Sequence, residues 1–170
     1  MVCPRCGHNN FEGADRCANC IEPLRDRDVP QPTAGFQGLL MEEPISAVAG
    51  HQPIVVTPET SVGEAVRLMK QRRLGCVLVV EGGKLAGIFT ERDLLLKLIG
   101  TDKALDHLYV REYMTPEPET VEGSDSLRIA LNKMSVGGFR HIPVVAEGQV
   151  MGLVTAKDAL KYLAREALKN

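Results

Sequence analysis

The chain has 170 residues, of which 44% are hydrophobic and 25% charged, and its formal net charge is −2 at pH 7. This apolar content is enough to bury a core, so we expect a globular protein of one or two domains. The near balance of charge and the 4% aromatic content argue against a nucleic-acid partner, which needs a positive field and stacking surfaces.

The apolar runs are short, and the one at residues 77–80 is far below the ~20 residues of a membrane-spanning helix. The N-terminus has cysteine, arginine and proline where a secretory signal would have an apolar stretch. We therefore expect no membrane partner and a location in the reducing cytoplasm.

Four of the five cysteines lie in the first 20 residues, with the spacing C-x2-C-x10-C-x2-C. Each C-x-x-C pair places two thiolates on a tight turn, and two such turns close a tetrahedral four-sulfur site that suits Zn²⁺. A pair of disulfides would need a secretory route, and a thioredoxin-like motif needs one such pair between a strand and a helix. The segment resembles a zinc ribbon over residues 1 to about 24, and we place this domain at residues 1–28. Its expected metal is zinc, with iron as an open alternative, and the ligands are Cys3, Cys6, Cys17 and Cys20.

The charge of this ribbon bears on its partner. Residues 1–28 carry five acidic and four arginine side chains, and four thiolates would add negative charge. Phosphate contacts need a local positive potential, so we predict a structural or protein-docking role instead of DNA recognition. His8 is expected to be a solvated turn residue. Residues 29–39 contain two prolines and two glycines without periodicity, which predicts a linker.

The rest of the chain contains an internal repeat. Residues 87–93, GIFTERD, return as residues 152–158, GLVTAKD, at an offset of 65 residues, and the same offset pairs Met69 with Met134. Two copies of one supersecondary unit are therefore present. We place them in residues 40–108 and 109–170.

Each copy is predicted to fold as β-α-β-β-α. In the first, the predicted elements are a strand at 54–56, a helix over about 62–73 behind a Ser61–Glu64 capping box, strands at 77–80 and 85–89, and a helix from Thr90. The second has a strand at Val121, a helix face at 127–134 that breaks at 137–138, strands at 142–145 and 150–154, and a helix from Ala156.

Four motifs carry a family resemblance: the two heptapeptides, the strand phrase FRHIPVV at residues 139–145, and YMTP at residues 113–116. With them, residues 40–168 resemble a tandem pair of cystathionine-β-synthase-type (CBS) domains, also called a Bateman module. The resemblance implies an α/β fold of the α+β kind, with two clefts related by a pseudo-two-fold axis. Such clefts commonly hold adenosine-containing ligands such as AMP, ADP, ATP or S-adenosylmethionine. It also implies a homodimer, in which we expect the helix faces at residues 62–69 and 127–134 to pack against a second copy.

The Thr-x-x-Asp motifs at residues 90–93 and 155–158 have two explanations. Both are capping boxes, and a capping box predicts no function. Capping does not explain Arg92 and Lys157 in the first helical turn, where the helix dipole disfavours a cation by about 0.3–1 kcal/mol. An anion at the helix N-terminus would reverse this penalty. The alternative is that both residues form weak surface ion pairs.

The family resemblance assigns roles to individual residues. Gly75 and Cys76 stand in repeat one where repeat two has the Arg-His pair, so the two clefts are expected to differ in affinity. A core position for the histidine remains open, and Cys76 is expected to be a packed thiol. The implied ligand contacts are Asp93 and Asp158 for ribose, Thr90 and Thr155 near the phosphate, and Arg140 and His141 for the phosphate.

No GxxxxGK[ST], GxGxxG or catalytic motif is recognised in the sequence. We therefore predict a non-catalytic sensor: a homodimeric adenine-nucleotide-binding module with a metal-filled ribbon that docks a protein. An iron-loaded, rubredoxin-like redox protein on the same scaffold is one alternative, and visible absorbance distinguishes it because Zn²⁺ is colourless. A nucleotide-responsive transcription regulator is the other, and it predicts salt-dependent DNA binding.

Overall fold

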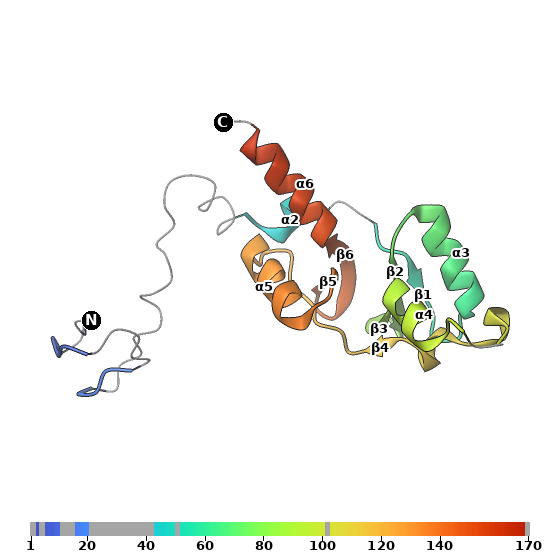
Figure 1. Cartoon of the computed structure of the whole chain (residues 1–170), viewed down its shortest axis with the longest axis horizontal. Helices are drawn as coiled ribbons and strands as arrows, with labels where there is room; N and C mark the ends of the chain where they lie inside the picture. The colour runs from blue at the N-terminus through green and yellow to red at the C-terminus, as the bar shows by residue number, and fades with distance from the viewer. Residues whose placement is uncertain are drawn as a thin grey trace. The chain divides into compact units, whose positions relative to one another are not determined.

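The computed structural model describes residues 3, 6–10, 16–20, 43–49, 52–100 and 103–168 (Figure 1). The chain divides into two compact units, Met1–Gly38 and Leu39–Asn170. The predicted linker at residues 29–39 lies outside the described residues. In the part of the chain that is described, no helix is both long and apolar enough to cross a membrane.

The strands of repeat one form a four-stranded sheet together with β4 from the start of repeat two, in the order β1-β2-β3-β4. β1 lies parallel to β2, and β2, β3 and β4 are antiparallel neighbours. Helices α3 and α4 lie beside this sheet (Figure 1), and the predicted β-α-β-β-α order is confirmed. The elements are β1 (Val55–Val56), α3 (Val62–Arg72), β2 (Cys76–Glu81), β3 (Lys84–Thr90), α4 (Glu91–Lys97) and β4 (Thr115–Pro116).

Repeat two has the same order, except that Val121 makes a single parallel bridge to Val144 where repeat one has strand β1. Its hairpin repeats the register of the first, since His141 pairs with Thr155 as Cys76 pairs with Thr90. The elements are α5 (Leu127–Gly137), β5 (His141–Ala146), β6 (Gln149–Thr155) and α6 (Ala156–Ala167).

Both hairpins close through two residues with positive φ, Gly82–Gly83 in the first and Glu147–Gly148 in the second. Two such residues form the tight turn whose twist matches that of the flanking strands. This turn fixes the register that brings Thr90 and Thr155 to the ends of their strands.

The two repeats exchange their leading segments. Helix α2 (Ile45–Val48) packs into the core of repeat two, whereas the short helices η2 (Leu105–His107) and η3 (Val110–Glu112) pack on repeat one. The backbone N–H of Ile45 donates to Asp125 O, and that of Val110 donates to Thr60 O. The two donors are 65 residues apart, and so are the two acceptors. Each repeat therefore completes the core of the other.

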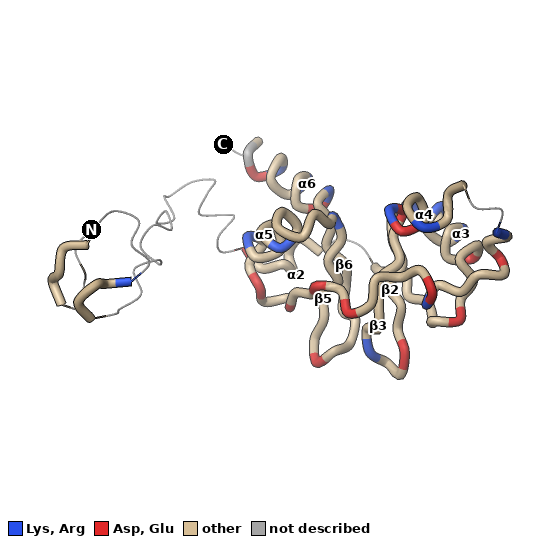
Figure 2. The backbone as a smooth tube through the Cα atoms, turned by 60° about the horizontal axis from the view of Figure 1, so that its bottom comes forward, with Lys and Arg blue, Asp and Glu red and all other residues tan. Residues whose placement is uncertain are grey.

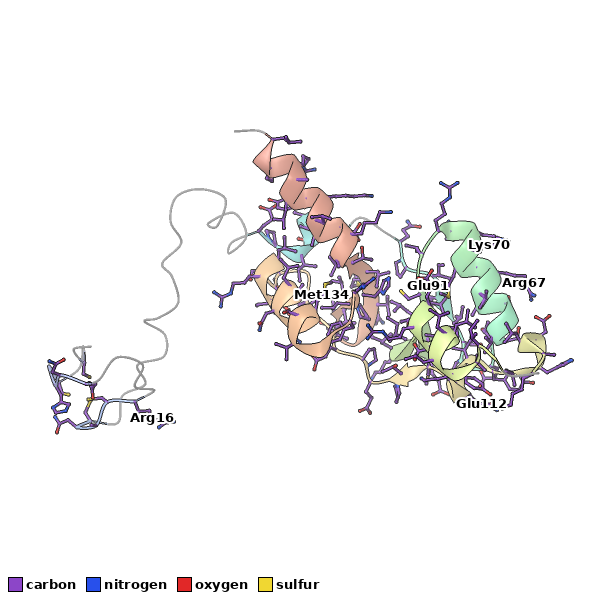
Figure 3. The ribbon with its side chains drawn as sticks, viewed as in Figure 1. Arg16, Arg67, Lys70, Glu91, Glu112 and Met134 are labelled. Carbon is purple, nitrogen blue, oxygen red and sulfur yellow. The ribbon has the colours of Figure 1, made fainter. Side chains whose placement is uncertain are left out.

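The helix faces at residues 62–69 and 127–134 were predicted to pack against a second copy. This prediction is wrong, because both faces are buried within the chain. Val62, Ala65 and Met69 are buried in the core of repeat one, and their equivalents on α5 are buried in the core of repeat two. The outer side of α3 carries charged residues such as Arg67 and Lys70, which extend away from the sheet (Figure 3). The apolar stripe that makes these helices amphipathic is thus used within one chain.

A third cluster joins the two hairpins and explains why β2 is apolar on both faces. Val77 and Val79 belong to the core of repeat one, whereas Cys76 and Leu78 meet Leu153 of repeat two. Because successive side chains of a strand point to opposite faces, β2 contributes to both clusters. The packing of the two hairpins brings the start of α4 close to the start of β5.

Candidate functional site

A cavity of about 710 Å³ lies between the two repeats. Its walls come from the start of α4, the start of β5, and the connection at residues 115–119 that joins the repeats. Acidic and basic positions alternate at the start of α4 (Figure 2). The charged and polar lining residues are Thr90, Glu91, Arg92, Asp93, Thr115, Glu117, Glu119, Arg140 and His141.

Five of the residues predicted to bind ligand share this cavity. Thr90, Arg92 and Asp93 come from repeat one, and Arg140 and His141 come from repeat two. The other three, Thr155, Lys157 and Asp158, are not among its lining residues. The structure thus combines the helix start of one repeat with the strand start of the other.

The two capping boxes predicted at the Thr-x-x-Asp motifs are present, whereas at Ser61 the structure gives the bond from Glu64 N to the Ser61 hydroxyl. Asp93 Oδ2 accepts hydrogen bonds from Thr90 N at 2.9 Å and from Thr90 Oγ1 at 2.7 Å, and Thr90 Oγ1 accepts from Asp93 N at 3.3 Å. Thr155 and Asp158 repeat this arrangement at 3.0, 2.6 and 3.1 Å. Both aspartates are 7% exposed. Each carboxylate therefore holds the start of its helix in addition to any role toward a ligand.

The second oxygen of Asp93 contacts a residue that the sequence analysis missed. Lys97 Nζ donates to Asp93 Oδ1 at 2.7 Å and to Tyr113 O at 2.5 Å. The signal in the sequence is the i,i+4 spacing of acid and base on one helix. In repeat two the equivalent position is Tyr162, whose buried phenol has its pKa raised to about 12 by burial and by Glu43.

Arg92 has a structural partner. Its Nη1 donates at 2.9 Å to the carbonyl of Gly138, the residue that ends α5 in the other repeat. A cation at the C-terminal end of a helix is favoured by the helix dipole. This contact explains a basic residue at the start of α4 without a bound anion. Lys157, its counterpart, is exposed.

Arg140 is exposed at the mouth of the cavity. Its guanidinium makes no hydrogen bond or ion pair within the described part of the chain, whereas its backbone carbonyl accepts from Ala156 N at 2.9 Å. The half-buried His141 lies next to it. Burial lowers the pKa of His141 and Arg140 lowers it further, which outweighs the opposing effects of Glu91 and Asp158. This shift favours the neutral imidazole at pH 7.

Gly75 explains the divergence between the repeats. A side chain at this position would begin 3.2 Å from His141 Nε2 and 3.2 Å from Glu91 Oε2. Figure 3 shows Glu91 on the side of repeat one that faces repeat two. Glycine thus leaves room for the two groups that line the cavity. The neighbouring Cys76 is buried, as predicted, and burial raises the pKa of its thiol to about 12.

The charges around the cavity nearly cancel. Two of its four acidic residues form ion pairs with lysines, Asp93 with Lys97 at 2.7 Å and Glu119 with Lys133 at 3.0 Å. Glu91 and Glu117 then balance the two arginines. A cavity with this balance offers one guanidinium to an anion, not a strongly positive surface.

The four N-terminal cysteines form a separate candidate metal centre. Their sulfur atoms all lie within 4.8 Å of one another, with Cys3 and Cys20 3.6 Å apart and Cys6 and Cys17 also 3.6 Å apart. A disulfide needs about 2.05 Å. A tetrahedral ion with metal–sulfur bonds of about 2.3 Å needs sulfurs about 3.8 Å apart. The observed spacing fits a four-sulfur metal site.

Asn10 links the two cysteine turns and was also missed. Its side-chain amide donates to His8 O at 3.1 Å and to Cys17 Sγ at 3.6 Å, and its Oδ1 accepts from Ala18 N at 2.9 Å. Burial raises the pKa of the Cys17 thiol, but hydrogen bonds from the backbone N–H groups of Cys20 and Asn19 lower this pKa to about 6. These contacts favour the thiolate form that binds metal. His8 is exposed and outside the cluster.

Comparison with curated proteins gives relatives of two kinds. An uncharacterized 17.7 kDa protein of Acidianus ambivalens is 31% identical over 125 residues, which cover 72% of this chain and 74% of the relative. An inosine-5′-monophosphate dehydrogenase of Korarchaeum cryptofilum is 40% identical over 106 residues, which cover 62% of this chain. The chain spans only 21% of that enzyme.

Solved structures share the same architecture. An uncharacterized conserved protein from Pyrococcus horikoshii has a TM-score of 0.66 at 31% identity, covering 72% of this chain and 92% of that one. A CBS domain pair in complex with 5′-methylthioadenosine and S-adenosyl-L-methionine has a TM-score of 0.65 at 24% identity, covering 72% and 97%. The family model of the CBS domain matches residues 45–100 and 110–165. The chain therefore belongs to the CBS-domain family.

Proposed function

We propose that this chain is a non-catalytic regulatory sensor that binds an adenosine-containing ligand between its two repeats. The observation that carries the proposal is the cavity in which Thr90 and Asp93 of repeat one meet Arg140 and His141 of repeat two. A carboxylate accepts hydrogen bonds from ribose hydroxyls, and a guanidinium donates to a phosphate. The CBS pair solved with two adenosine-containing ligands has the same fold and supports this ligand class.

The charge of the cavity favours AMP over ATP. Two arginines line the cavity. Arg92 donates to the Gly138 carbonyl, whereas the Arg140 guanidinium has no partner among the described residues. Glu91 and Glu117 repel the further phosphates of a triphosphate. The Arg140 guanidinium, unpaired within the described residues, can donate charge-assisted hydrogen bonds to the one phosphate of AMP.

A second binding position is proposed at Thr155, Lys157 and Asp158. Gly75 and Cys76 stand in repeat one where Arg140 and His141 stand in repeat two. The second position therefore has no guanidinium from that strand, and we expect it to bind a nucleotide more weakly than the cavity does.

A screen by thermal shift tests the sensor. Adenosine, AMP, ATP and S-adenosylmethionine are compared at equal concentrations. A ligand at a hundredfold excess over its dissociation constant stabilises the native state by ~2.7 kcal/mol. We expect AMP to raise the melting temperature more than ATP does. No shift with any of the four ligands would contradict the proposal.

The cysteine cluster is proposed to hold one Zn²⁺ that folds the N-terminal unit and lets it dock a protein. The segment is too small for an apolar core to keep it folded, and we therefore expect the bound metal to stabilise its fold. A reducing cytoplasm keeps the four thiols available for the ion. Elemental analysis tests this, and stoichiometric iron with visible absorbance would support the redox alternative instead.

Assembly is proposed to use the exposed apolar residues of α4 and α6 in place of the buried stripes of α3 and α5. Leu96 is 77% exposed and Leu160 is 67% exposed. Leu95 and Ile99 add to the apolar surface on and just after α4. A second copy would cover these residues, and we propose a homodimer on this ground.

A further inference from the structure

We propose that Lys97 restricts access of ribose to Asp93 and so sets the affinity of the cavity. The proposal rests on the function proposed above. It starts from the ion pair of 2.7 Å between Lys97 Nζ and Asp93 Oδ1, in which the Asp93 side chain is 10% exposed and that of Lys97 is 40% exposed. In an i,i+4 pair on an open helix surface the carboxylate is accessible to water, whereas the Asp93 carboxylate is largely shielded from it.

The hydrogen-bonding capacity of Asp93 shows the conflict. A carboxylate has about four lone-pair sites. Thr90 N and Thr90 Oγ1 occupy two of them on Oδ2, and Lys97 occupies one on Oδ1. The fourth site, also on Oδ1, accepts a long hydrogen bond of 3.5 Å from Thr115 Oγ1, which a ribose hydroxyl can replace at little cost. Two vicinal ribose hydroxyls need two sites, so a ribose is fully bound only when Lys97 releases Oδ1.

Release of Lys97 also affects the connection between the repeats. The same ammonium donates to the carbonyl of Tyr113 at 2.5 Å, and Tyr113 packs against the core of repeat one just before β4. A ribose that displaces Lys97 from Asp93 therefore removes one of the two contacts that hold this ammonium between Asp93 and the segment that leads to repeat two. Repeat two has Tyr162 at this position, so no ammonium competes there from the equivalent residue.

The test uses two nucleosides and three variants of the full chain. Lys97→Met removes the competing ammonium, and we expect adenosine to bind about fivefold more tightly, equivalent to about 1 kcal/mol. 2′-Deoxyadenosine has one hydroxyl of the pair and needs only the site that holds the long Thr115 bond, so its affinity should stay within about twofold. Lys97→Arg keeps a cation and should retain the affinities of the parent protein.

Lys103→Met is the matched control. Lys103 lies 3.4 Å from the Tyr113 hydroxyl but does not contact Asp93, so its loss should change neither affinity. Calorimetry measures the affinities, and circular dichroism shows that each variant is folded. Weaker or unchanged adenosine binding in Lys97→Met, or an equal gain for 2′-deoxyadenosine, would overturn the role of Lys97. Absence of adenosine binding in all four proteins would overturn the proposed function as well.

Discussion

Asn10 is the residue on which the geometry of the candidate metal centre depends most, apart from the cysteines. Its one amide group contacts the end of the first cysteine turn and the start of the second. Residues that orient metal ligands in this way commonly change metal affinity by about 10- to 100-fold when they are removed. Asn10 is 8% exposed, so no water molecule easily replaces it.

Asn10→Ala should therefore weaken zinc binding by about 10- to 100-fold. Competition with a coloured chelator measures this change. His8→Ala is the control, because Asn10 contacts the backbone oxygen of His8 and not its imidazole. Equal loss of affinity in both variants would mean that His8 takes part in the site.

The sequence predicted the four cysteines and not Asn10 or Lys97. Cysteine spacing is a local signal that a metal site requires. Asn10 is recognised only from the turn that directs it toward Cys17, and the i,i+4 spacing of Asp93 and Lys97 is too common on helices to mark a site by itself. Their residue types are common on protein surfaces, so composition does not mark them.

Helix α3 ends in a less favourable conformation than its counterpart α5. Arg73, its C-terminal cap, has a φ of 52°, whereas α5 ends at Gly138 with a φ of 65°. These two residues are 65 positions apart and are therefore equivalent. Glycine adopts this left-handed conformation without the penalty that a side chain brings.

Arg73→Gly should therefore stabilise the protein by about 0.5–1 kcal/mol. Urea unfolding monitored by circular dichroism measures the free energy. The control is Arg72→Gly, which lies within α3 and should destabilise by about 1 kcal/mol. A loss of stability in Arg73→Gly would show that the arginine side chain makes contacts worth more than the strain.

At the level of elements, periodicity predicted the long helices and both hairpins to within two or three residues. It did not predict α2, η2, η3 or β4, which have two to four residues each. Such short elements carry no period, and α2, η3 and β4 also depend on partners from the other repeat. The exchange of leading segments shows this, since Ile45 and Val110 are buried and donate backbone hydrogen bonds to residues about 80 and 50 positions away along the chain.

For the whole molecule, the apolar pattern of a helix shows which side is buried and not what covers it. The family resemblance supplied a second copy as the cover for the stripes of α3 and α5, whereas the chain's own strands cover them. The same limit applies to the cavity. The sequence indicated Asp93 and Arg140 separately, and only the packing of the hairpins shows that they share one cavity.

Leu160→Asp should weaken the proposed dimer, because it places a charge on the exposed apolar side of α6. Sedimentation velocity over a range of concentrations should show a larger monomer fraction than in the parent protein. Met151→Asp is the control, since Met151 is similarly exposed at 66% but lies on β6. A parent protein that is monomeric at every concentration would contradict the dimer.

The central claim is that one cavity binds an adenosine ligand with groups from both repeats, and Arg140→Ala tests it most directly. A charge-assisted contact to phosphate contributes about 1.5–3 kcal/mol. Calorimetry should show AMP bound about 10- to 100-fold more weakly by Arg140→Ala, with the affinity for adenosine nearly unchanged because adenosine has no phosphate. Equal losses for AMP and adenosine, or no loss for either, would contradict the claim that Arg140 of repeat two completes the site at Asp93 of repeat one.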